Sequence, residues 1–169
     1  QYKRITNRYE SGVLTGKGTE WGGAQVRTEA TGYGTAFFVQ EMLSASGDDL
    51  DGKTCVVSGS GNVAIYAIEK IHQLGGTVIA CSDSSGYIVD PEGIDLDTIK
   101  EIKLANRDRI AAYADRRPQA TFVADKSIWG VGCDLAFPCA TQNELSGRDA
   151  KSLISRGVIA VVEGANMPC

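Results

Sequence analysis

Ser58-Gly59-Ser60-Gly61-Asn62-Val63-Ala64 is the stretch that decides the fold of this chain. It follows the apolar run Thr54-Cys55-Val56-Val57 and opens a segment whose apolar residues recur at helical intervals. A strand, a glycine turn and a helix in that order are the context that the dinucleotide-binding fingerprint G-x-G-x-x-G/A requires. Gly59 permits the sharp turn, Gly61 lets a pyrophosphate approach the backbone, and the small Ala64 lets the helix pack close to the strand. The unpaired N–H groups at the start of the helix are then available to phosphates.

The fingerprint also calls for an acidic residue about 20 positions further on. Asp83 stands 22 positions after Gly61, at the end of a second apolar run, residues 78–81. Because the strand, the helix, the second strand and the acid all stand in register, the sequence favours dinucleotide binding over a glycine turn with a structural role alone.

The residues around Asp83 leave the choice between NADP and NAD open. An acid at this place usually accepts a hydrogen bond from the ribose 2′-OH and repels a 2′-phosphate, which favours NAD. Ser84 and its neighbour Ser85 instead supply hydroxyl donors, and the following segment carries a basic cluster that could neutralise a phosphate. The cluster consists of Lys103, Arg107 and Arg109. A solvated helix face is the other explanation of these cations. From these residues alone, both NADP and NAD stay open.

The rest of the chain alternates between patterns typical of helices and strands. Helices are expected from residue 28 to a polar turn at 46–49, at 63–74, within 96–113 and at 150–155. Strands are expected at 54–57, 78–81, 121–123, 134–137 and 158–162, with a short extended piece at 87–89. This alternation indicates an α/β protein with a parallel sheet and right-handed crossovers, which is a Rossmann-type doubly wound, mostly parallel sheet.

The pattern also suggests where domains begin and end. Residues 1–27 are polar and glycine-rich, and we expect them to be the end of a preceding domain and its connection. Residues 28–169 are expected to form the dinucleotide-binding domain. No helical pattern follows the last expected strand, so we expect this domain to be truncated and its sheet incomplete at the C-terminus.

The composition excludes several classes of protein. The chain has 169 residues, of which 43% are hydrophobic and 22% charged, as in one soluble globular domain with a sizeable core. A net charge of −4 does not indicate a nucleic-acid surface. No apolar run approaches the roughly 20 residues that span a bilayer, and the polar first residues do not resemble a signal peptide. We therefore expect a cytoplasmic protein without a nucleic-acid or membrane partner.

The cysteines and the single histidine do not form a recognisable metal or disulfide pattern. The five cysteines are Cys55, Cys81, Cys133, Cys139 and Cys169. An odd number without a C-x-x-C motif indicates reduced thiols of a cytosolic protein. His72 is expected on the flank of the helix after the glycine turn. The spacing is too wide for a Cys/His zinc site, so we expect no metal.

Two late loops carry amide side chains at strand ends. Residues 138–143 contain Gln142 and Asn143, and residues 163–166 end in Asn166. Ligands of open parallel sheets lie beyond the carboxyl ends of the strands, and an amide there can pair with a nicotinamide carboxamide or orient a polar substrate. Turn formation is the alternative explanation, because Asn and Gly are common turn residues.

Taken together, six motifs resemble the nucleotide-binding half of a glutamate dehydrogenase of the microbial hexameric type. They occur in order at residues 1–4, 12–17, 27–34, 59–64, 138–143 and 163–168, so the resemblance covers essentially the whole chain. Thr28 departs from the pattern, because the family's motif usually has proline there, and this affects a backbone turn more than a reacting group. The pattern Ser82-Asp83-Ser84, with Lys103 and Arg109, is similar to that of NADP-preferring members, so the resemblance implies NADP, with NAD as the alternative.

The resemblance implies an enzyme that interconverts L-glutamate with 2-oxoglutarate and ammonia, passing hydride between the substrate and the nicotinamide, as a homo-hexamer. Arg27 would then assist substrate binding, Asn166 would lie near the nicotinamide, and Ala140 and Thr141 would line its ribose. The cofactor-binding residues expected from the fingerprint and the resemblance are Thr31, Gly59, Ser60, Gly61, Asn62, Val63, Asp83, Ser84, Lys103, Arg109, Ala140, Thr141 and Asn166.

The lysine and aspartate that the family uses for proton transfer lie upstream of the part that matches Gln1. No aspartate precedes Asp48 here, and Lys17 belongs to a different motif, where it reads as a loop lysine. We therefore expect no catalytic residue in this chain and no glutamate turnover by the chain alone. The alternatives are a related dehydrogenase of leucine, valine or phenylalanine, and a dinucleotide-binding module without catalysis.

Overall fold

The computed structural model describes residues 2–169, which form a six-stranded sheet flanked by helices. The strands are β1 (Thr54–Val57), β2 (Thr77–Asp83), β3 (Gly86–Val89), β4 (Thr121–Ala124), β5 (Leu135–Phe137) and β6 (Ala160–Val161). The α-helices are α1 (Tyr2–Thr6), α2 (Ala30–Ser44), α3 (Asn62–Gln73), α4 (Leu96–Lys100), α5 (Ala112–Arg116) and α6 (Gly147–Ser155). Short turns of 3-10 helix are η1 (Ser11–Val13), η2 (Thr19–Trp21) and η4 (Ile128–Gly130), and η3 (Glu101–Ala105) is a π-helical turn.

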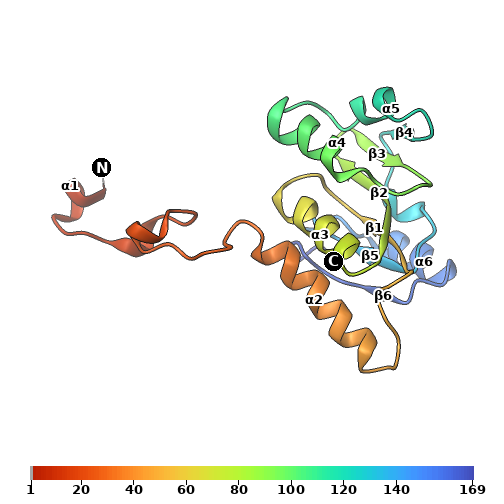
Figure 1. Ribbon diagram of the computed structural model, residues 1–169, viewed down its shortest axis with the longest axis horizontal. Helices are drawn as coiled ribbons and strands as arrows, with labels where there is room; N and C mark the ends of the chain where they lie inside the picture. Colours follow the sequence, from red (N-terminus) through yellow and green to blue (C-terminus); the bar gives the residue numbers. More distant parts are fainter. Residues whose placement is uncertain (1) are drawn as a thin grey trace.

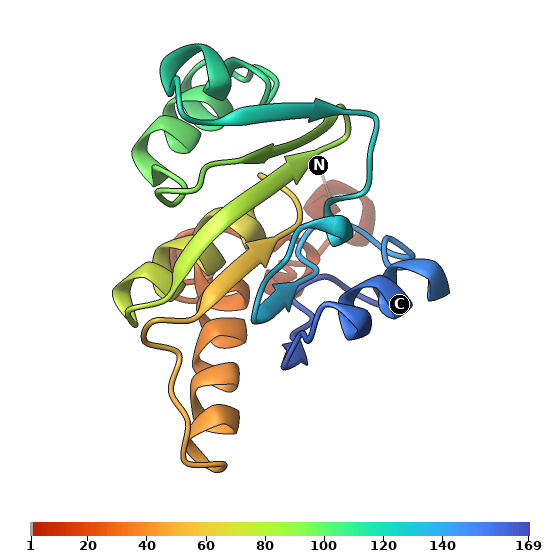
Figure 2. The same ribbon diagram turned by 90° about the vertical axis from the view of Figure 1, so that its right-hand side faces the viewer.

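The sheet is mixed, with the strand order β4-β3-β2-β1-β5-β6. β1 pairs in parallel with β2 and β5, and β5 pairs in parallel with β6, so three of the five pairings are parallel. The α/β class and the mostly parallel sheet are therefore confirmed. The expectation of a parallel sheet is wrong for β3, which runs antiparallel to both β2 and β4 (Figure 2). Only Ser84 and Ser85 separate β2 from β3, and a parallel pair needs a crossover of a dozen or more residues.

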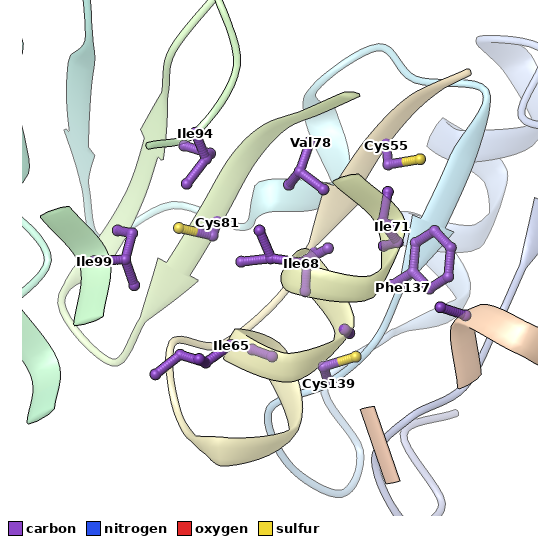
Figure 3. Packing of buried hydrophobic residues seen from close by; sticks show 14 of the residues in the cluster. Cys55, Ile65, Ile68, Ile71, Val78, Cys81, Ile94, Ile99, Phe137 and Cys139 are labelled. Atoms are coloured by element: carbon purple, nitrogen blue, oxygen red, sulfur yellow. The ribbon is translucent and has the colours of Figure 1, made fainter. Parts of the chain in front are cut away.

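Alternate residues of the central strands face two apolar clusters on opposite sides of the sheet. In β1, Cys55 and Val57 belong to one cluster and Val56 to the other. The first cluster contains buried residues of α2, α3, α4 and α5, and Figure 3 shows Ile65, Ile68 and Ile71 of α3 directed at the sheet. The second contains Ile128 and Trp129 of η4 and Leu153 of α6. Helices therefore cover both faces of the sheet, as the buried apolar strands require.

The observed elements differ from the expected ones mainly at their ends. The helix predicted at 63–74 is α3, shifted by one residue, and the strand predicted at 78–81 continues to Asp83. The helical segment predicted at 96–113 is interrupted, because η3 widens the last turn and Arg107 adopts a left-handed backbone with φ 54°. β6 is shorter than the predicted 158–162.

A buried polar cluster attaches the segment after α4 to the sheet. Asp90, which is completely buried at the end of β3, accepts hydrogen bonds from Tyr113 Oη at 2.9 Å and Arg117 Nε at 3.3 Å. Tyr113 Oη in turn accepts from the backbone N–H of Asp95 at 2.7 Å. Burial, together with the bond to Asp90, raises the pKa of Tyr113 well above its usual range. The cluster holds the chain that carries Arg109 in a defined place beside β2.

Residues 2–29 extend to one side of the sheet and its helices (Figure 1). None of these residues is buried, whereas α2 contributes Ala36, Val39 and Leu43 to the main core. The boundary predicted near residue 28 stays a prediction. Within residues 2–169, no helix has the combined length and apolar character needed to cross a membrane.

Candidate functional site

The glycine turn between β1 and α3 is tightly fitted on one side and open on the other. Gly59 has φ +85°, and a Cβ there would lie 3.1 Å from the Cα of Ala140. Its N–H donates to the Oγ of Ser82 at 2.9 Å, which ties the turn to the end of β2. A Cβ on Gly61, by contrast, would meet nothing within 4 Å. Space for a ligand therefore lies directly over the start of α3.

The first turn of α3 can receive an anion. Gly61 is the N-cap residue and has no side chain to satisfy the first N–H groups, which stay available to a phosphate. The Nδ2 of Asn62 donates to the carbonyl of Thr28 at 2.5 Å, which connects the turn before α2 to the start of α3. Thr31, exposed in the first turn of α2, lies in the same corner. The contact uses the carbonyl of Thr28, so it does not depend on which side chain stands at this position.

Asp83, the predicted acid, has its carboxylate occupied by the protein itself. One oxygen accepts from the backbone N–H and hydroxyl of Ser85, at 2.8 and 2.6 Å. The other accepts from the backbone N–H of Ile110 at 2.9 Å and lies 3.4 Å from the Nζ of Lys103. Burial opposes ionisation of this carboxyl, but these hydrogen bonds outweigh it and lower its pKa.

Two of the three predicted cations come together at the end of β2. Lys103 contacts Asp83 as described and also donates to the carbonyl of Asp108 at 2.8 Å. The Nη1 of Arg109 donates to the Oγ of Ser84 at 2.5 Å, and both residues are exposed. The hydrogen bonds and ion pairs of residues 2–169 do not connect Arg107 to this group, so the third cation of the cluster belongs to the solvated face.

A cavity of about 460 Å³ lies between the ends of β2, β4 and β5. It is lined by Ser82, Asp83, Ser84, Gly86, Asp125, Lys126, Ser127, Ile128, Trp129, Ala140, Thr141 and Glu144. Sequence reasoning missed the lining from residues 125–129 and Glu144. β4 is antiparallel to β3, which is antiparallel to β2, so β2 and β4 end at the same edge (Figure 2). The short turn at Ser84 and Ser85 was the signal that could have identified this edge.

The two late loops lie side by side. The carbonyl of Pro138 accepts from the N–H groups of Gly164 and Ala165, each at 2.8 Å, and the N–H of Asn143 donates to the carbonyl of Met167 at 3.0 Å. These bonds bring the loop of Ala140 and Thr141 next to the loop of Asn166. A Cβ on Gly164 would lie 3.2 Å from the Cγ1 of Val63, so the second loop also reaches α3.

The family model described as Glutamate/Leucine/Phenylalanine/Valine dehydrogenase matches residues 22–169. The chain belongs to this family. It is 54% identical to the glutamate dehydrogenase of Bacteroides thetaiotaomicron, 52% to the NAD(P)-specific enzyme of Xylanibacter ruminicola and 53% to the NADP-specific enzyme of Helicobacter pylori J99. Each match covers 99% of this chain and only 38 to 39% of the relative. The resemblance to a part of a glutamate dehydrogenase is thereby confirmed.

The fold of this dehydrogenase segment also matches solved structures. The crystal structure of Plasmodium falciparum glutamate dehydrogenase superimposes with a TM-score of 0.90 at 44% identity, over 99% of this chain and 36% of that one. The relatives' names include both NAD(P)-specific and NADP-specific enzymes, so family membership leaves the cofactor preference open.

Three other residues singled out in the sequence of this dehydrogenase segment have no hydrogen bond or ion pair to the glycine turn within residues 2–169. Arg27 is exposed in the turn before α2, and the hydrogen bonds and ion pairs of residues 2–169 do not link it to the glycine turn. Lys17 donates to the nearby carbonyl of Leu14, as a loop lysine does. His72 lies partly buried near the end of α3, and burial lowers its pKa. The roles suggested for these residues stay predictions.

Proposed function

We propose that this chain is the dinucleotide-binding part of a glutamate dehydrogenase and that its adenosine end is adapted to NADP. The observation that carries the proposal is the meeting of Lys103 and Arg109 with Asp83 and Ser84, one strand away from the open glycine turn. A dinucleotide lying along the carboxyl edge of the sheet would reach both places.

The pyrophosphate would be held at the start of α3. The backbone N–H groups after Gly61 and the positive end of the helix dipole attract phosphate oxygens, and the open space above Gly61 admits them. Ser60 and Val63 flank this turn. Thr31 and Asn62 would contact the dinucleotide from the corner between α2 and α3.

The hydrogen bonds of Asp83 support the proposed preference for NADP. An ionised carboxylate has about four acceptor positions, and four donors already occupy those of Asp83. It has no free acceptor for the ribose 2′-OH, which is the interaction that normally selects NAD. The hydroxyl of Ser84 and the guanidinium of Arg109 offer the donors and the positive charge that a 2′-phosphate needs.

The reaction would be the interconversion of L-glutamate with 2-oxoglutarate and ammonia. The cofactor supplies or accepts the hydride when bound. From this chain, Ala140 and Thr141 would line the nicotinamide ribose, Asn166 would lie near the nicotinamide, and Arg27 would assist substrate binding. The proton-transferring lysine and aspartate lie outside these residues in our proposal, and so do most contacts of the homo-hexamer. A cytoplasmic location is part of the same proposal.

Parallel calorimetric titrations with NADPH and NADH test the cofactor preference. We expect tighter binding of NADPH. In Arg109→Ala the ratio of the NADPH and NADH affinities should fall by at least about tenfold, because one charged hydrogen bond contributes roughly 1.5–3 kcal/mol. Arg107→Ala is the matched control, since Arg107 is exposed on the same segment and should leave both affinities unchanged. Tighter binding of NADH would contradict the preference for NADP and indicate that Asp83 selects NAD. Binding of neither dinucleotide would refute the proposal.

A second assay tests whether the catalytic groups lie outside this chain. The purified chain should show no sustained glutamate-dependent reduction of NADP, and such activity would place the catalytic groups within this chain. The alternatives are a related dehydrogenase of leucine, valine or phenylalanine, and a non-catalytic module. The identity of 52 to 54% to the named glutamate dehydrogenases supports glutamate over the other amino acids.

A further inference from the structure

Glu144 lies where the walls of the candidate site meet. One oxygen of its carboxylate accepts hydrogen bonds from the backbone N–H groups of Ala140 and Thr141, at 3.0 and 3.3 Å. Its own carbonyl accepts from the indole N–H of Trp129 at 3.3 Å. The side chain also lines the cavity of about 460 Å³. A single residue therefore contacts both the loop after β5 and the buried Trp129 under that cavity.

The neighbours of Glu144 extend this junction to the other late loop. The N–H of Asn143 donates to the carbonyl of Met167 at 3.0 Å, and the N–H of Leu145 donates to the carbonyl of Pro168 at 2.9 Å. Asn143 has a left-handed backbone, φ 53°, so the chain turns sharply just before Glu144. The position of Glu144 is thus determined from both sides, and its carboxylate is held towards the two N–H groups.

We propose that Glu144 is a positioning residue that holds Ala140 and Thr141 in the shape that receives the cofactor. The inference rests on the proposed dinucleotide binding. Ala140 packs against Gly59, where even a Cβ would come within 3.1 Å of its Cα, so a displaced loop would change the width of the glycine turn. Without the carboxylate, the N–H groups of Ala140 and Thr141 would lose the acceptor that they have in the structure, and the loop would be free to move.

The charge of Glu144 provides a competing explanation that can be separated from positioning. A carboxylate beside bound phosphates repels them, and its removal would then tighten binding. Glu144→Gln keeps the length and an acceptor oxygen but removes the charge. Glu144→Asp keeps the charge but is shorter by one methylene, so it cannot reach both N–H groups in the same way. Positioning predicts that Glu144→Asp binds the dinucleotide more weakly than the unaltered chain and that Glu144→Gln binds no more tightly. Repulsion predicts that Glu144→Gln binds more tightly than the unaltered chain and that Glu144→Asp is unchanged.

The test combines dinucleotide titration with amide hydrogen exchange of the full chain, measured by NMR. We expect Glu144→Gln to bind NADPH within about threefold of the unaltered chain and Glu144→Asp to bind about tenfold more weakly. The Ala140 and Thr141 amides should exchange faster in Glu144→Asp and stay protected in Glu144→Gln. Glu41→Gln, on the exposed side of α2, is the matched control.

Tighter binding by Glu144→Gln, or unchanged exchange at Ala140 and Thr141 in Glu144→Asp, would overturn the positioning role. The exchange measurement needs no ligand. If the unaltered chain bound no dinucleotide, the proposed function would fail, whereas the exchange rates would still decide whether Glu144 holds the loop.

Discussion

Two glycines of α2, Gly32 and Gly34, should respond in opposite ways to the same substitution. A Cβ on Gly32 would lie 2.5 Å from the backbone N of Ala67 and 2.6 Å from the carbonyl O of Val63, both in α3. A Cβ on Gly34 would meet nothing within 4 Å. Both glycines lie within α2, Gly32 as its third residue and Gly34 as its fifth, so their intrinsic helix propensities are similar and the surroundings decide the difference. Gly32→Ala should therefore destabilise the protein, and Gly34→Ala should stabilise it.

The distances set the expected magnitudes. Ordinary van der Waals contact begins at 3.4 Å, so α2 and α3 must separate by nearly 1 Å to admit a methyl group at Gly32. The obstructing atoms are backbone and cannot rotate away. Overpacking of this kind costs about 3 kcal/mol, at the upper end of its usual range, and the gain in helix propensity offsets about 1 kcal/mol. The net loss is about 2 kcal/mol, against a gain of about 0.5–1 kcal/mol for Gly34→Ala.

Urea denaturation followed by far-ultraviolet circular dichroism measures both changes. The two variants should differ by about 3 kcal/mol in the free energy of unfolding, with similar m-values. Gly32→Ala should also weaken dinucleotide binding, because Asn62 and the start of α3 move with the helix. A Gly32→Ala variant as stable as Gly34→Ala would refute the close approach of α2 and α3.

Three further predictions concern side chains that are buried to different degrees. Burial lowers the pKa of His72, so near its ordinary pKa the unfolded chain binds more protons than the folded one. The free energy of unfolding should therefore fall as the pH is lowered from about 7 to about 5. His72→Gln should reduce this dependence on pH. Tyr113→Phe removes a hydrogen bond to the buried Asp90, so the carboxylate loses a donor. The free energy of unfolding measured by urea denaturation should fall by about 1–3 kcal/mol. A thiol reagent should modify the exposed Cys169 first. The buried Cys139, whose pKa is raised by burial to about 12, should react only when the protein unfolds. Cys169→Ser should abolish the fast reaction.

Local patterns predicted the first half of the sheet well. The strand at 54–57 is β1 without correction, and α3 begins one residue before the predicted start. Both depend on signals within a few residues of each other: an apolar run, the Gly59 turn and helical periodicity. The direction of β3 was not recognised, because it depends on the two-residue turn at Ser84 and Ser85 rather than on the alternation of elements. The place of β4 beyond β3 depends on the same turn, and the side of the cavity formed by residues 125–129 was missed with it.

Glu144 shows a different limit of sequence reasoning. Its neighbours, Gln142 and Asn143, carry amides that could bind a nicotinamide, whereas a glutamate in such a loop is typical of a solvent-exposed charge. Its contacts are backbone N–H groups three and four residues earlier, which every sequence supplies. Only the fold of the loop brings them to one oxygen. A polar residue whose partners are all backbone has no partner that the sequence could have indicated.

Asp83 shows why a correctly placed motif residue can still have a different role from the one its position suggests. The fingerprint located the acid at the end of β2, and the structure has it there. What the position does not reveal is whether the carboxylate has free acceptors. The donors to Asp83 come from Ser85, two residues along, and from Lys103 and Ile110, 20 and 27 residues along, beyond β3 and α4. An acid with four donors holds the basic segment against β2, and that is the same segment that brings Arg109 to Ser84. In the binding mode that we propose, the acid that usually selects NAD therefore helps to position the cation that would meet a 2′-phosphate.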